Sequence, residues 1–409
     1  MYPIRRRIAQ SVYYGWVIVF VCLLASLVVF GTSYAFGVFF DSFIREFERS
    51  QAVISVAFGL QTASLFGGAV VAGRFIDRYG RRRITAIGGS LFVAGLVWTA
   101  LAESYVELLL AFGVVTALGM AILYVVGYAT VPVWFTRRRG VAGGIAASGL
   151  GVGLVVVPSG ASLLIETVGW RRALLVVAAV VAVFSLVIAV LVADRPADID
   201  ATDARAAGTT GSSDISSGEL LDTIGSGSFL IVFLGWVLIF ASLYVVLGYI
   251  VLYATEVGFG RRVGVLAITV LGISTTVTRI GVGLLSDYVG RVVTFVVCAA
   301  ILGGSTALIP AAGSALLLFA VVTLFGVGYG GCGGLLGPFV ADVFGNDGLN
   351  TLFSVMSLSF GIAGILAPPY AGFVFETIGA YDVAFVSVGL GSVLGAGLVF
   401  VGTRYRSGD

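Results

Sequence analysis

The sequence contains no histidine and no lysine, and charged residues make up only 11% of its 409 positions. Without histidine it lacks the side chain that most often relays protons or binds metals near neutral pH. Its three cysteines, Cys22, Cys298 and Cys332, lie in apolar runs, so we expect neither a disulfide nor a metal site. Nothing resembles a phosphate-binding loop or a nucleophile with its base. We therefore expect no cofactor, no nucleic-acid partner, no ATP-driven pump and no enzyme.

Apolar residues dominate what is present, at 59% of the chain with a mean hydropathy of +1.10. A soluble domain carries roughly 25% charged residues, so the solvent of this chain is expected to be lipid. A helix that crosses the hydrocarbon core needs about 20 mostly apolar residues. The sequence therefore predicts an all-α membrane protein with twelve transmembrane helices, at about residues 13–40, 52–76, 84–102, 107–135, 141–165, 173–193, 229–255, 263–286, 292–312, 315–344, 350–375 and 381–403.

One long polar stretch, 194–228, separates the sixth and seventh spans and is rich in Ala, Asp, Gly, Ser and Thr. This composition is typical of a flexible linker. It divides the chain into an N-terminal half (1–193) and a C-terminal half (229–409). Arginines outside the spans gather on the side of the N-terminus, which predicts that the linker and both termini are cytoplasmic. We expect a protein of the cell membrane, and a monomer.

The two halves repeat each other with a constant offset of 210 residues. Such parallel repeats are typical of secondary transporters, whose substrate binds near the midplane between the halves. The pattern therefore predicts two pseudo-symmetric six-helix bundles. The matching pairs include Tyr34 and Tyr244, Gly73 and Gly283, Asp77 and Asp287, Gly80 and Gly290, Arg81 and Arg291, and Glu166 and Glu376.

The segment GRFIDRYGRRR at 73–83, between the second and third spans, resembles the loop motif of the major facilitator superfamily. GLLSDYVGR at 283–291 is similar to its second copy. The resemblance implies the major facilitator fold, in which such loops act as a switch between conformations. An aspartate there can cap a neighbouring helix and pair with arginine in one conformation only. The residues of this expected switch are Gly73, Asp77, Arg78, Gly80, Arg81, Asp287 and Arg291.

Three further segments resemble the monocarboxylate transporter and oxalate:formate antiporter branch of that superfamily: YYGWVIVF at 13–20, TRRRGVAGGIAASGLG at 136–151 and GWRRALLV at 169–176. The chain also departs from known patterns. Thr275 stands where monocarboxylate transporters place an aspartate, and Phe360 stands where the oxalate carrier has a lysine. The Gly-Pro pair of drug:proton antiporters is absent from the fifth span.

Arg279 is the only ionised residue that we place deep in a span. An arginine there costs about 2.5–3.5 kcal/mol on insertion scales and usually faces a bundle interior or a watery cavity. Its guanidinium matches a carboxylate bidentately. We expect it to bind an anionic substrate. The alternative is a structural arginine that bonds to backbone carbonyls or reaches toward the membrane surface.

Four tyrosines are further substrate-binding candidates, because a phenol donates to a carboxylate while its ring covers an apolar tail. They are Tyr34, Tyr244, Tyr124 and Tyr329. Packing is the alternative for each, and also for Tyr128, one turn from Tyr124. Glycines of the tenth span, including Gly333, are interpreted as packing residues.

The sequence thus predicts a transporter of small organic anions, namely monocarboxylates, that works by alternating access. Proton symport, exchange and uniport remain open, since no acidic residue falls clearly within a span. The partners expected are an organic anion, the bilayer and, in the symport case, protons. The alternatives are a carrier of another solute, including drug efflux, and a membrane nutrient sensor that transports nothing.

Overall fold

The computed structural model describes residues 13–135, 139–193, 222–345 and 349–406. Within these ranges the chain forms helices and no strand. Twelve helices are long and apolar enough to cross a membrane, as predicted. The linker prediction falls mostly on residues 194–221, which lie outside the described residues.

The N-terminal half contains six spans, two of which are built from several helical segments. Its helices are α2 (Tyr14–Tyr34), α3 (Phe36–Phe47), α4 (Gln51–Tyr79), α5 (Arg81–Leu101), α6 (Tyr105–Leu108), the π-helical η1 (Leu109–Thr116), α7 (Ala117–Ala129), α8 (Val131–Trp134), α9 (Arg139–Val168) and α10 (Trp170–Leu191).

The C-terminal half repeats this arrangement with helices that are mostly continuous. They are α12 (Gly227–Glu256), α13 (Arg261–Val289), α14 (Arg291–Leu308) with the 3₁₀ turn η4 (Ile309–Ala311), α15 (Ala315–Phe344), α16 (Leu349–Ile378) and α17 (Asp382–Arg406). The bounds of α4 and α13 differ by 210 residues at both ends, as do those of α9 and α16. The helix bounds therefore carry the repeat seen in the sequence.

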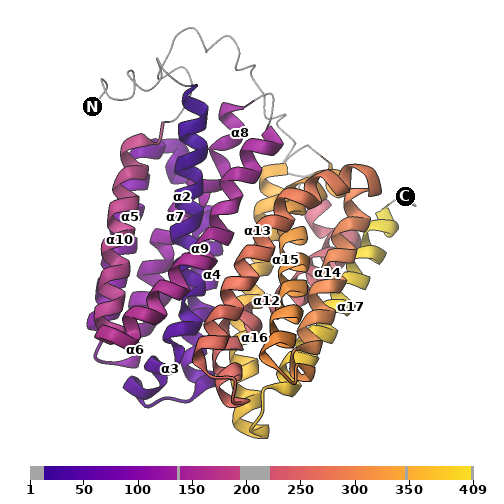
Figure 1. Cartoon of the computed structure of the whole chain (residues 1–409). Helices are drawn as coiled ribbons and strands as arrows, with labels where there is room; N and C mark the ends of the chain where they lie inside the picture. Colours follow the sequence, from indigo (N-terminus) through magenta and orange to yellow (C-terminus); the bar gives the residue numbers. More distant parts are fainter. Residues whose placement is uncertain (1–12, 136–138, 194–221, 346–348, 407–409) are drawn as a thin grey trace.

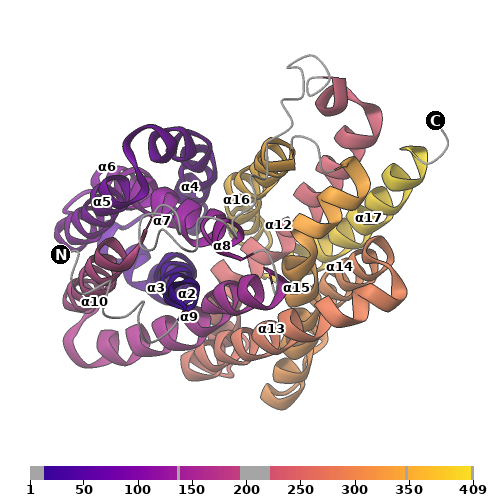
Figure 2. The ribbon, with the colours of Figure 1, turned by 90° about the horizontal axis from the view of Figure 1, so that it is seen from above.

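The two halves lie side by side, with the indigo-to-magenta bundle next to the orange-to-yellow one (Figure 1). The first described helix, α2, begins at the end of the molecule where α17 ends. We call this the near end and the opposite one the far end. Seen from above, α9 packs against α13, and α4 lies beside α16, along the boundary between the halves (Figure 2).

Contacts between the halves gather from the far end to the middle of the molecule. Along α4 and α16 they begin where the Ala52 amide donates to Glu376 Oε1 at 2.8 Å and reach the stacked rings of Phe66 and Phe360, 5.2 Å apart. Along α9 and α13 they run from the ion pair of Glu166 with Arg262 to the contact of Gly151 with Thr276. In this structure the halves are thus joined at the far end.

The turns that follow α4 and α13 require glycine. Gly80 links α4 to α5 with φ 84°, and Gly290 links α13 to α14 with φ 95°. Such positive φ values are disfavoured for residues with a Cβ atom. These repeat mates make both connections short and place the start of α5 and α14 directly after the preceding span.

Candidate functional site

Arg279 lies in α13 and is 7% exposed. Its Nε atom has no hydrogen-bond partner among the described residues. Among the described residues, no carboxylate lies within ion-pair distance of its guanidinium, and no backbone carbonyl is seen to accept from it. A buried charge without an opposite charge is costly. This arginine therefore does not have the structural pairing that was the alternative.

The Arg279 side chain points away from the near end. Its Cα lies beside Gly334: a methyl group added at Gly334 would be 3.7 Å from the Arg279 Cα. Its guanidinium lies against Gly333: a methyl group added at Gly333 would be 2.4 Å from Nη2. Cζ then lies 5.4 Å from the centre of the Tyr329 ring. Because α15 runs from the far end to the near end, Gly334, Gly333 and Tyr329 lie progressively farther from the near end. The Arg279 side chain therefore extends into the bundle, toward the far end. The alternative of an arginine that reaches for the membrane surface is not what the structure shows.

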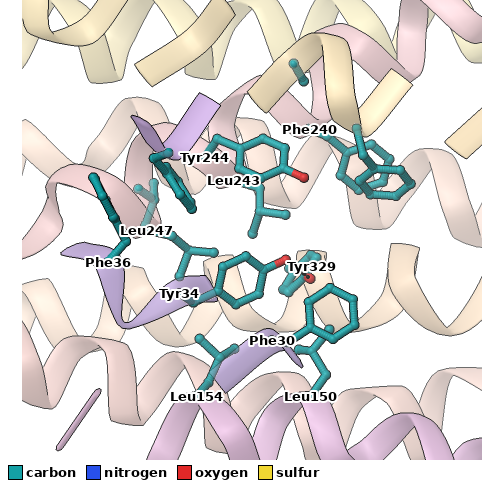
Figure 3. Packing of buried hydrophobic residues seen from close by; sticks show 14 of the residues in the cluster. Phe30, Tyr34, Phe36, Leu150, Leu154, Phe240, Leu243, Tyr244, Leu247 and Tyr329 are labelled. Carbon is teal, nitrogen blue, oxygen red and sulfur yellow. Dashed lines mark hydrogen bonds between the residues drawn. The ribbon is translucent and has the colours of Figure 1, made fainter. Parts of the chain in front are cut away.

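Tyrosine hydroxyls from both halves surround this guanidinium. The Tyr34 and Tyr329 hydroxyl oxygens are 3.2 Å apart and share a hydrogen bond between α2 and α15. Figure 3 shows these two oxygens next to each other, with Phe30 and Leu150 close by. The hydroxyls of Tyr128 and Tyr329 also face the guanidinium of Arg279. Hydroxyl groups from both halves of the chain thus lie near this cation.

The other predicted tyrosines lie at different distances from this centre. Tyr124 packs against Tyr128 with ring centres 4.9 Å apart, and Arg279 is among the charges that act on it. Tyr244 is 1% exposed; its ring packs on Phe58 and its hydroxyl faces Thr62. The structure therefore gathers Tyr34, Tyr124 and Tyr329 around Arg279, whereas Tyr244 belongs to the adjoining aromatic packing.

Aromatic rings form an apolar wall that begins at these tyrosines. The ring centres of Tyr124 and Phe66 are 5.5 Å apart, and the Phe66 ring stacks on that of Phe360. Phe360 also stacks on Phe240, with ring centres 4.1 Å apart, and contacts Trp236 at 6.1 Å. All four apolar rings are buried. The position at which the oxalate carrier has a cation is thus occupied here by a ring within an aromatic cluster.

The sequence alone missed two features of this region. Gln61 is a fully buried amide in α4; its Oε1 accepts from Ser33 at 2.9 Å, and its Nε2 lies 3.2 Å from the Met120 sulfur. A lone glutamine in an apolar run was the available signal. Gly333 was interpreted as a packing residue, yet it lies against the guanidinium. Only the pairing of α13 with α15 reveals this contact.

The predicted switch is described in part. Arg291 donates from Nη1 to Asp342 Oδ1 at 2.8 Å, which ties α14 to α15, and the Arg78 guanidinium lies over the Tyr79 ring at 5.4 Å. Gly73 has open space where a side chain would be, and Arg81 takes part in further interactions. The side chains of Asp77 and Asp287 lie outside the described residues, so the latch itself stays a prediction.

Twelve spans in two related halves, with a buried cation between them, define a membrane transporter of the secondary type. The chain belongs to the Major Facilitator Superfamily, whose family model matches residues 22–368. Members of this superfamily carry small-molecule substrates. The resemblance noted from the loop motif is thereby confirmed.

Several curated relatives match nearly the whole chain. Monocarboxylate transporter 13 of Rattus norvegicus is 24% identical over 388 residues, which cover 94% of this chain and 88% of the relative. Monocarboxylate transporter 2 of the same species is 25% identical over 408 residues, covering 94% and 82%. The fujikurins efflux protein of Gibberella fujikuroi is 25% identical over 368 residues, covering 88% and 76%. At such identities the relatives agree on a transporter but differ in what they carry.

Proposed function

We propose that this protein carries small organic anions, and monocarboxylates in particular, across the membrane by alternating access. The observation that supports this most is Arg279: a guanidinium that is nine-tenths buried between the halves, with an unpartnered Nε and no carboxylate beside it in the described residues. Arginine keeps its charge when buried. Because a buried charge without a partner is unfavourable, the site is suited to an anion that arrives from outside the protein.

The surroundings favour a monoanion with an apolar body. A carboxylate can accept two parallel hydrogen bonds from one guanidinium. The hydroxyls of Tyr34 and Tyr329 supply neutral donors next to it. The rings of Phe66, Phe240 and Phe360 supply apolar contact and no second cation. A dianion would therefore leave one of its charges without a partner here.

The names of two relatives support this assignment, since both are monocarboxylate transporters. The efflux protein among the relatives supports a second candidate, a carrier that exports a larger solute. The two candidates differ in one requirement. An anion carrier needs the carboxylate of its substrate, whereas an exporter of neutral compounds would transport equally well without it.

We place the protein in the cell membrane as a monomer. The distribution of its arginines supports a topology with both termini in the cytoplasm. The near end then faces the cytoplasm. With this orientation, the contacts at the far end close the molecule toward the outside. Transport requires the reverse state, in which these contacts part.

Uptake of labelled formate, lactate, pyruvate and oxalate into proteoliposomes tests the proposal, with wild type compared with Arg279→Gln. The glutamine keeps hydrogen-bonding capacity but removes the charge. Arg404→Gln is the matched control, because Arg404 is exposed at the end of α17. We expect saturable uptake of a monocarboxylate that is lost in Arg279→Gln and kept in Arg404→Gln. Equal transport by Arg279→Gln, or by an ester of the same substrate, would contradict the proposal.

A further inference from the structure

Gly333 in α15 lies against the head group of Arg279. A methyl group at this position would be 2.4 Å from Nη2, 2.9 Å from Cζ and 3.2 Å from Nε. All three nearest atoms belong to the guanidinium, so this group lies directly against the backbone of α15 at Gly333. The space that a side chain would take at residue 333 is the space in which the guanidinium sits.

Two other glycines of α15, Gly328 and Gly330, make a different kind of contact. A methyl group at Gly328 would meet the backbone of α14, at Leu302 N and Cys298 O, and one at Gly330 would meet the Thr275 carbonyl of α13. These are packing contacts between helices, in which the backbone cannot easily give way. At Gly333 the obstacle is the end of a long side chain, which can move. A substitution there is expected to displace the guanidinium and leave the helices in place.

The displaced group is the one that binds the anion in the function proposed above. Arg279 is nine-tenths buried, and its Nε has no partner in the structure, so its present position is not determined by an ion pair among the described residues. The contacts that do hold it are the Tyr329 ring, the facing Tyr128 hydroxyl and the backbone at Gly333. Removal of the last of these changes where the charge is presented.

We propose that Gly333 is a positioning residue: its lack of a side chain holds the Arg279 guanidinium against α15 and directs it at the substrate between the halves. This inference rests on the proposed function, since it assigns a residue to the same site. It also implies that the size of residue 333 sets the affinity for the anion. With glycine at position 333, the guanidinium can lie directly against the backbone of α15. Any larger residue would move the guanidinium toward the space that the substrate would occupy.

A double-mutant cycle tests the inference, with KM, kcat and thermal stability measured for each variant. The variants are Gly333→Ala, Arg279→Lys and the two combined, with Gly328→Ala as the packing control. Lysine keeps the positive charge but has no atom at the place of Nη2, so it relieves the closest contact. Where a variant transports too slowly for kinetic measurements, the rise in its melting temperature on addition of the transported monocarboxylate measures binding.

We expect Gly333→Ala to raise KM roughly tenfold or more, as loss of a charge-assisted hydrogen bond would, with kcat and thermal stability close to wild type. In the Arg279→Lys background the same substitution should have little further effect. Gly328→Ala should lower stability and leave KM unchanged. Should Gly333→Ala not accumulate by itself, the combined variant is expected to accumulate and to bind like Arg279→Lys.

Additive effects of the two substitutions, or an equal rise in KM for Gly328→Ala, would overturn the inference, because either shows that residue 333 acts through helix packing alone. Such a result would leave the proposed function intact. Failure of the proposed function would appear earlier and separately, as a wild-type protein that carries no monocarboxylate.

Discussion

Glu166 and Glu376 occupy equivalent positions 210 residues apart, and each contacts the first turn of a helix in the opposite half. Glu376 accepts from the Ala52 amide at the start of α4, and Glu166 lies 3.8 Å from the guanidinium of Arg262 at the start of α13. Ala52 and Arg262 are themselves repeat mates. Both pairs place a carboxylate at the positive end of a helix dipole. At the far end, each half thus contributes a glutamate that contacts the first turn of a helix in the other half.

The first prediction concerns the seam that these contacts close. A Cβ atom at Gly361 of α16 would lie 3.8 Å from the Phe66 Cβ of α4, which is suitable for a disulfide between the halves. We expect the variant Phe66→Cys with Gly361→Cys to form that disulfide and to lose nearly all transport under oxidising conditions, because the seam can no longer part. Reduction should restore the activity, as measured by uptake into proteoliposomes.

The controls for this cross-link are the two single-cysteine variants, each of which should transport at the same rate with and without the oxidant. The native cysteines are buried and unpaired, so they are not expected to interfere. A cross-linked protein that still transports would mean that these halves do not separate along α4 and α16.

The spans could be predicted from the sequence because a long apolar run with few charges has one outcome in a membrane, a helix across it. The ends were less well predicted. The first helix continues as α3 to Phe47, beyond the apolar run, since a helix need not stop at the edge of the hydrocarbon. The expected span 107–135 breaks at Thr130, just before Pro132. A proline lacks the amide that would continue the helix.

The candidate site could be predicted only where a residue type was unusual for its place. Arg279 stood out because a charge within a span is rare. Tyrosines are common in membrane helices, and composition could not separate Tyr329, beside the guanidinium, from Tyr244, beside Phe58. Gly333 was one glycine among many. Its contact with Arg279 depends on how α13 packs on α15, which local sequence does not determine.

The second prediction separates those two tyrosines. Tyr329→Phe removes a hydroxyl that bonds to Tyr34 and faces the guanidinium, so we expect KM for the carboxylate to rise roughly 5- to 30-fold. Tyr244→Phe removes a hydroxyl that faces Thr62, and KM should change less than about threefold. Initial uptake rates over a range of substrate concentrations give both values. A larger rise in KM for Tyr244→Phe than for Tyr329→Phe would indicate that the substrate binds closer to α12.

The third prediction contrasts a structural arginine with Arg279. Arg171 at the start of α10 donates from Nη1 to the carbonyls of Ala100 and Ala102, at 2.9 and 2.8 Å, and from Nη2 to Glu46 at 2.7 Å. Its loss leaves the end of α5 without these donors. Arg171→Ala should therefore lower the free energy of unfolding by roughly 1–3 kcal/mol and leave KM unchanged.

Thermal unfolding of the purified protein in detergent measures that loss, with Arg172→Ala as the neighbouring control. For Arg279→Gln the reverse pattern is expected: a small change in stability and a large loss of uptake. If Arg171→Ala raised KM while the melting temperature stayed constant, the start of α10 would have to take part in substrate binding.

The fourth prediction concerns the mode of transport and follows from the charge of the site. With a monoanion bound, the guanidinium is neutralised; without one, the described residues around Arg279 offer hydroxyls and no carboxylate. Reorientation of the empty protein would then move an uncompensated charge through a medium of low polarity. We expect uptake into vesicles preloaded with the same anion to exceed uptake into empty vesicles about tenfold, the effect of a barrier difference of about 1.4 kcal/mol.

A variant that supplies the missing charge provides the control for this comparison. Tyr128→Glu would place a carboxylate beside the guanidinium that Tyr128 faces in the structure. It should weaken anion binding and, because the empty site is then neutral, bring the two uptake rates close together. Equal rates in the wild type would mean that the empty protein reorients freely, and that a group other than the substrate balances the charge of Arg279.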